Sequence, residues 1–133
     1  MQYELIWIGT SKKTREEFEK YLELDCSYEL DDPNYIACRF CKDCGEKWYD
    51  EDFLYLEGSF EKEIPVEELI RDAIIADGEY EKILQKCKEL GITKANTMIG
   101  LGIEDDDDFQ VSKPYKESYN GLKYMGKFIN AYA

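Results

Sequence analysis

Histidine is absent from the 133-residue sequence, and no apolar run approaches the length of a membrane span. The first absence excludes Ser-His and Cys-His nucleophilic sites and histidine-ligated metals. The second argues against a transmembrane helix, which needs about 18 or more consecutive apolar residues. Gln2, Tyr3 and Glu4 follow Met1 where a secretory signal would carry basic residues, so we expect no signal peptide.

Basic residues are scarce relative to acidic ones. The chain has 17 lysines and arginines against 30 aspartates and glutamates, a net charge of −13. Such a charge repels nucleic-acid phosphates and anionic lipids and attracts basic proteins. We therefore expect a basic protein partner, and neither nucleic acid nor a membrane. The simpler alternative is that the charge serves solubility alone.

The acidic charge is uneven along the chain. Residues 25–63 hold 12 acids and 4 bases, a net charge of −8, whereas residues 109–133 carry a net charge of +3. A concentrated field of this kind suits the steering of a cationic protein.

Apolar periodicity and turn residues predict one α+β domain over residues 1–133, with a mostly antiparallel sheet packed with about four helices. Thr14 and Glu17 have the spacing of a capping box at the start of the first helix. The sequence Asp31-Asp32-Pro33 is typical of a helix start and predicts a second helix over 34–44. We expect the remaining helices over 65–74 and 80–90, strands over 3–8, 53–60, 96–104, 109–111 and 122–129, and a turn at 105–108.

Cysteine is present in an odd number, which favours a reduced, cytoplasmic protein over a disulfide framework. Three of the five lie in a run, Cys38, Cys41 and Cys44, with the spacing of metal-binding thiolates. On a helix over 34–44 these side chains would rise by about 9 Å and turn through roughly 120°, too far apart for one zinc ion. Cys41 and Cys44 also fall on the apolar stripe of that helix, so we expect structural cysteines and no cofactor. A metal- or thiol-dependent protein built on Cys38, Cys41 and Cys44 stays open as the alternative.

Other motifs give little support to catalysis, so we expect no enzyme. The segment Gly100-Leu101-Gly102 lacks the third glycine and helix start of a dinucleotide site. The four acids Asp105 to Asp108 are consecutive, whereas calcium loops alternate their carboxylates and include a glycine.

The segment 48–52 places a tryptophan and a tyrosine beside three acids. Aromatic rings with polar groups are favoured anchors at protein interfaces, and acids steer a basic partner toward them. The alternative is that Trp48 and Phe53 are core residues beside solvated acids. The candidate partner-binding residues are Asp31, Asp32, Trp48, Tyr49, Asp50, Glu51, Asp52, Asp105, Asp106, Asp107 and Asp108.

Several short segments occur in an order that resembles one known family. They are Trp7-Ile8-Gly9, Glu17-Phe18 with Tyr21-Leu22, Asp43 and Gly45 before Trp48 to Phe53, Cys87 to Gly91 with Ala95-Asn96-Thr97, and Leu122 to Phe128. Together they resemble the immunity protein 22 family of bacterial polymorphic toxin systems.

The resemblance implies a small cytoplasmic antitoxin of contact-dependent competition, made beside a secreted toxin and neutralising it by direct binding. Toxins of such systems are often nucleases, whose active sites are basic because they hold phosphate. The cysteine run is not a feature of the resemblance and leaves a metal-binding variation open.

Overall fold

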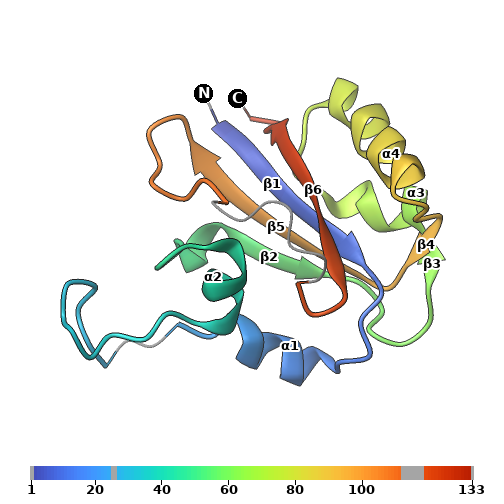
Figure 1. The fold of residues 1–133 in the computed structure, drawn as a ribbon. Helices are drawn as coiled ribbons and strands as arrows, with labels where there is room; N and C mark the ends of the chain where they lie inside the picture. Colours follow the sequence, from blue (N-terminus) through green and yellow to red (C-terminus); the bar gives the residue numbers. More distant parts are fainter. Residues whose placement is uncertain (1, 25–26, 112–118, 133) are drawn as a thin grey trace.

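A four-stranded antiparallel sheet forms the centre of the protein (Figure 1). The computed structural model describes residues 2–24, 27–111 and 119–132. The strands lie in the order β2-β5-β1-β6, and their bounds are Leu54–Glu57 for β2, Thr97–Glu104 for β5, Gln2–Gly9 for β1 and Leu122–Ile129 for β6. A second, two-stranded sheet pairs β3 (Ile64–Pro65) with β4 (Lys94–Ala95). The predicted α+β class with a mostly antiparallel sheet is confirmed.

Helices cover both faces of the sheet (Figure 1). On one face, α1 (Arg15–Leu22) and α2 (Arg39–Cys44) pack around Trp7, whose ring centroid lies 5.0 Å from that of Phe40. On the other, α3 (Val66–Leu69) and α4 (Tyr80–Glu89) pack against the opposite side of β1. Alternate side chains of β1 therefore enter two separate cores, as the period of a strand requires. No helix among the described residues is long and apolar enough to cross a membrane.

The first helix begins where its capping box predicts. The Glu17 amide donates to the Thr14 hydroxyl over 3.2 Å, and the Thr14 amide donates to the Glu17 carboxylate over 3.1 Å. Two amides at the helix start are thus satisfied reciprocally.

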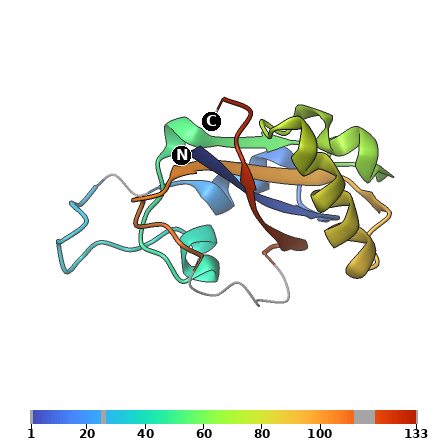
Figure 2. The same ribbon diagram turned by 90° about the horizontal axis from the view of Figure 1, so that it is seen from above.

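The predicted helix over 34–44 is wrong in its first half, because α2 begins at Arg39 with Cys38 as its N-cap. The Asp32 carboxylate accepts from the Asn34 amide over 2.8 Å, which closes a turn around Pro33 and satisfies the backbone without a helix. Residues 27–36 form an arm that projects from the body of the molecule (Figure 2), and the chain rejoins the core at Cys38. The arm is tied back where the Tyr35 hydroxyl donates to the Lys47 carbonyl over 2.6 Å.

Three further elements differ from prediction. The helix expected over 65–74 is only α3, followed by the 3-10 helix η2 (Ile70–Asp72). The strand expected over 53–60 is shortened to β2, because the 3-10 helix η1 (Glu51–Phe53) precedes it and Gly58 turns the chain with φ at 132°. The strand expected over 109–111 does not form, and Val111 has a φ of 48° that no strand residue adopts.

The expected turn at 105–108 is present. The Asp107 amide donates to the Glu104 carbonyl over 3.1 Å and reverses the chain at the end of β5. The final expected strand, 122–129, coincides with β6.

Cys87 is fully buried on the inner face of α4, where its thiol lies 3.7 Å from the Met125 sulfur. We expect Cys87→Asp to lower the free energy of unfolding by about 3–5 kcal/mol, because it buries an unpaired carboxylate. Gln85→Asp, which places the same carboxylate on the exposed side of α4, serves as the control. Urea denaturation measures both variants, and a Cys87→Asp variant as stable as the parent would contradict the placement of this face in the core.

Candidate functional site

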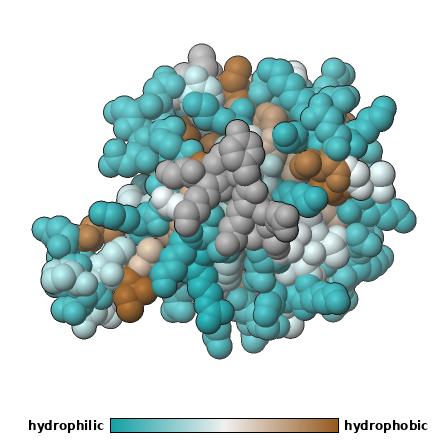
Figure 3. All heavy atoms as spheres, in the orientation of Figure 1, coloured by the Kyte–Doolittle hydropathy of each residue, from teal (hydrophilic) through white to brown (hydrophobic). Residues whose placement is uncertain are grey.

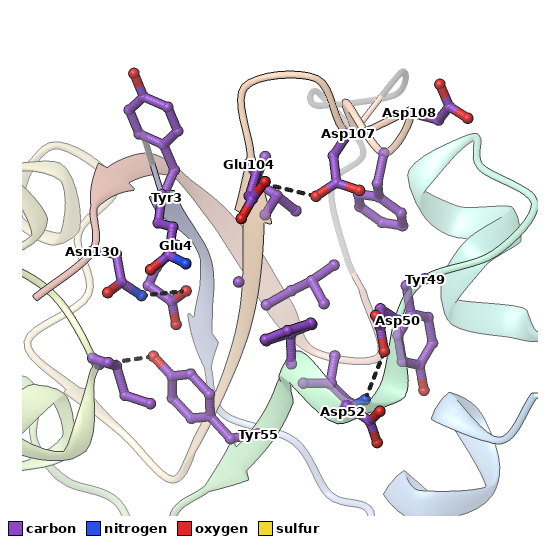
Figure 4. A pocket seen from close by; sticks show the side chains of 18 of the residues that line it. Tyr3, Glu4, Tyr49, Asp50, Asp52, Tyr55, Glu104, Asp107, Asp108 and Asn130 are labelled. Atoms are coloured by element: carbon purple, nitrogen blue, oxygen red, sulfur yellow. Dashed lines mark hydrogen bonds between the residues drawn. The ribbon is translucent and has the colours of Figure 1, made fainter. Parts of the chain in front are cut away.

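A groove of about 480 Å³ lies at the edge of the sheet, where β2 begins and β5 ends (Figure 4). β2 pairs with β5 only as far as Leu54 opposite Leu101, so the last residues of β5 extend beyond it. The loop that leads into β2, the turn after β5, the start of β1 and the segment after β6 complete the walls. Segments from both ends and the middle of the chain thus meet at one place.

Exposed apolar side chains line this groove. Among the described residues, seven large hydrophobic side chains are exposed, and four of them are groove residues: Trp48, Phe53, Ile74 and Tyr132. The other three, Tyr28, Leu30 and Ile36, lie on the arm. On the face seen in Figure 3, hydrophilic side chains predominate and hydrophobic ones form only small separate patches. Clustered exposed apolar side chains mark interaction surfaces.

Acidic side chains also line the groove. Asp50 and Asp52 come from the loop before β2, and Asp107 and Asp108 come from the turn after β5 (Figure 4). The Asp50 carboxylate accepts from the Asp52 amide over 3.1 Å, and the Asp107 carboxylate accepts from the Glu104 amide over 2.8 Å. The fold therefore brings together two predicted acidic segments that are more than 50 residues apart.

The carboxyl group of Glu4 lies in the groove wall and is buried, with 2% of the residue exposed. The Asn130 amide nitrogen donates to it over 3.2 Å (Figure 4). The Tyr55 hydroxyl, which accepts from the Ile74 amide over 3.1 Å, is its second partner. Glycines on β5 make this arrangement fit, because a Cβ on Gly102 would lie 2.8 Å from Glu4 Oε2 and one on Gly100 would lie 2.0 Å from the Tyr55 ring.

Burial raises the pKa of Glu4 to about 7, and the hydrogen bonds from Asn130 and Tyr55 offset only part of that effect. The carboxyl is therefore close to half protonated at neutral pH. Burial also raises the pKa of Tyr55, so its hydroxyl keeps its proton and acts as a donor to Glu4.

The other predicted partner-binding residues lie in different places. Glu51 lines a separate shallow hollow beside α1, and Asp105 and Asp106 are exposed on the turn without lining the groove. Asp31 and Asp32 lie on the arm, away from the groove (Figure 2).

Of the two predicted aromatic anchors, Trp48 is 45% exposed, but Tyr49 is only 4% exposed. The Tyr49 ring packs edge-on against Phe40, and its hydroxyl donates to the Leu22 carbonyl. The expectation that the Tyr49 ring is a surface anchor is corrected by this burial. Phe53, considered above as a core residue together with Trp48, is instead 57% exposed.

The clustered cysteines are buried, and Cys26 lies outside the described residues. The Cys41 amide donates to Cys38 Sγ over 3.3 Å, and a hydrogen bond from the Cys41 thiol lowers the pKa of Cys38 to about 7. Burial raises the pKa of Cys44, which keeps that thiol protonated. The described part of the chain contains no group of three or more cysteines and carboxylates placed to hold one metal ion.

Sequence reasoning missed Glu4, Tyr55 and Asn130, which come together only in the folded chain. Glu4 did carry a signal, since it occupies the same face of β1 as the buried Ile6 and Ile8. The alternate glycines Gly100 and Gly102 carried another, because glycine inside a strand often marks a close approach of other groups.

A family model described as Immunity protein 22 matches residues 5–130. No curated protein and no solved structure matches the chain.

We expect Glu4→Gln to change how stability depends on pH. Glu4 has a raised pKa in the folded state, so its contribution to stability is complete below about pH 4.5 and is lost as the pH rises toward 7. A buried amide cannot ionise, so the variant should gain about 2 kcal/mol relative to the parent between about pH 5.5 and pH 8.5. Urea denaturation across this range measures the difference, and parallel curves for the two proteins would contradict the raised pKa.

Proposed function

The chain belongs to the immunity protein 22 family, and we propose that it neutralises its cognate toxin by placing the acidic groove over a basic surface of that toxin. Immunity proteins bind toxins and inhibit them without catalysis, which agrees with the lack of catalytic motifs in the sequence.

One observation supports this choice of surface above the others. Within the described chain, the groove is the place where exposed apolar side chains and acidic side chains occur together on the body of the molecule. Apolar anchors supply affinity once water is excluded, and the surrounding carboxylates supply specificity and rapid association.

The charge of the protein points to the class of toxin. A net charge of −13 accelerates encounter with a cationic surface. Nuclease active sites are cationic because they bind phosphate, and we propose that a nuclease domain of a polymorphic toxin system is the partner. The protein would then act in the bacterial cytoplasm, where the nucleic acid to be protected lies.

The first test of this proposal is coexpression with the cognate toxin domain, which we expect to be encoded beside this protein. We expect a stable complex and loss of toxicity. A toxin that remains free and active in the presence of this protein would overturn the proposed function.

Reversing two charges at the groove should slow association. We expect Asp50→Lys with Asp52→Lys to reduce the association rate about tenfold or more at low salt, because steering acts on diffusional encounter. The defect should shrink as salt rises, since the Debye length falls from about 30 Å at 0.01 M to about 8 Å at 0.15 M. Stopped-flow fluorescence measures the rates.

The matched control reverses Glu81 and Glu89, two exposed residues of α4 that do not line the groove. This control should affect association much less than the groove variant. Equal effects from the two reversals would show that only the total charge matters and that the groove is not the contact surface.

Truncating the exposed rings should act on dissociation instead. We expect Trp48→Ala or Phe53→Ala to speed dissociation about tenfold or more while leaving stability almost unchanged, because each ring is exposed in the free protein and buried in the complex. Surface plasmon resonance measures the off-rate, with Ile36→Ala on the arm as control. A larger loss from Ile36→Ala than from either groove variant would place the interface on the arm.

A further inference from the structure

Glu4 is a buried acid that has no cationic partner among the described residues. No lysine or arginine of the described chain forms a salt bridge with it, whereas the other buried carboxylate, that of Glu79, lies 2.8 Å from Lys82. The partners of Glu4 are two neutral groups, from Asn130 and Tyr55. Buried charges in proteins are normally paired, because the desolvation cost is otherwise large.

The Glu4 carboxyl packs directly against Gly102 of β5 in the wall of the groove. A Cβ at that position would lie 2.8 Å from Glu4 Oε2 and 3.5 Å from the Phe53 Cβ. A carboxyl oxygen and an apolar side chain therefore both lie beside Gly102, and all three residues line the groove. A lysine or arginine side chain combines these two chemistries, with an apolar stem and a cationic end.

We propose that Glu4 is a specificity-determining residue, whose carboxylate receives the cationic end of one lysine or arginine side chain of the toxin while Phe53 packs against the stem. This inference rests on the proposed function, because it assigns a role to one residue within the groove. It differs from steering by Asp50 and Asp52, since a buried ion pair acts on affinity and not on encounter.

The pairing makes binding depend on pH. Glu4 is half protonated near pH 7, and a bound cation would favour its ionised form, so binding releases a proton. The groups that face Glu4 are Tyr55 from β2 and Asn130 after β6. In the sheet, Glu4 pairs with Gly102 of β5 and with Phe128 of β6. Tyr55 keeps its proton over this range and the other three residues do not titrate. Affinity should therefore rise about tenfold between about pH 6 and pH 8.

A blocked Phe-Lys-Phe tripeptide and its norleucine counterpart test the inference without the toxin. Norleucine keeps the stem and lacks the charge. We expect saturable NMR shifts at the Gly102 and Phe53 amides, with the lysine peptide binding about tenfold more tightly than the norleucine peptide at about pH 8. Glu4→Gln should remove this difference, whereas Glu57→Gln, on the same strand as Tyr55 but outside the groove, should retain it.

Equal binding of the two peptides, an unchanged preference in Glu4→Gln, or shifts confined to other residues would each overturn the role of Glu4. Absence of saturable binding by the lysine peptide would overturn it as well. These failures are separate from failure of the proposed function, which is judged by complex formation between the parent protein and the toxin. A Glu4→Gln variant that neutralises the toxin with undiminished affinity would reject the ion pair and leave the proposed function intact.

Discussion

The burial of β1 on both faces is the constraint on which the rest of the structure depends. β1 pairs with β5 on one side and β6 on the other, and its alternate side chains enter two separate cores. Helices are therefore needed on both faces, and α3 with α4 cover the second face over Ile6 and Ile8. Glu4 lies on that same face, two residues before Ile6. There it contacts Tyr55, Asn130 and Gly102. The groove lies where β5 extends beyond the start of β2.

Local patterns predicted the elements whose signals are local. The capping box of Thr14 and Glu17 located the start of α1, and apolar alternation located β6. The same reasoning extended α2 too far, because Asp32 uses its side chain to close a turn and not to cap a helix. It also assigned a strand to 109–111, where Phe109 and Val111 are buried as individual side chains in irregular backbone. An apolar side chain can be buried on a paired strand or in irregular backbone. The sequence alone does not distinguish these two cases.

The acidic residues of the candidate site could be predicted from the sequence. Which of them lie together in the folded chain could not. Residue type and adjacency drew attention to 48–52 and 105–108, and six of those residues line one groove. Which of them face it depends on the backbone between them: the 3-10 helix η1 carries Asp52 into the groove and turns Glu51 toward α1. Tyr49 and Trp48 are likewise neighbours in sequence with opposite exposure. Long-range pairing decides these outcomes, since the position of β2 against β5 determines where the loop before it lies.

The acids of the groove serve the fold and the surface at once. Asp50 caps η1 and Asp107 closes the turn after β5, each through one carboxylate oxygen that accepts a backbone amide. An ionised carboxylate has about four acceptor positions, so one such bond leaves most of its capacity for a partner. The capping bond also fixes the rotamer of the side chain, which lowers the entropy lost when a cationic group binds. Under the proposed function, charges that local turns already hold in place give a basic partner preorganised contacts, so that short loops provide the recognition and the sheet provides the rigidity.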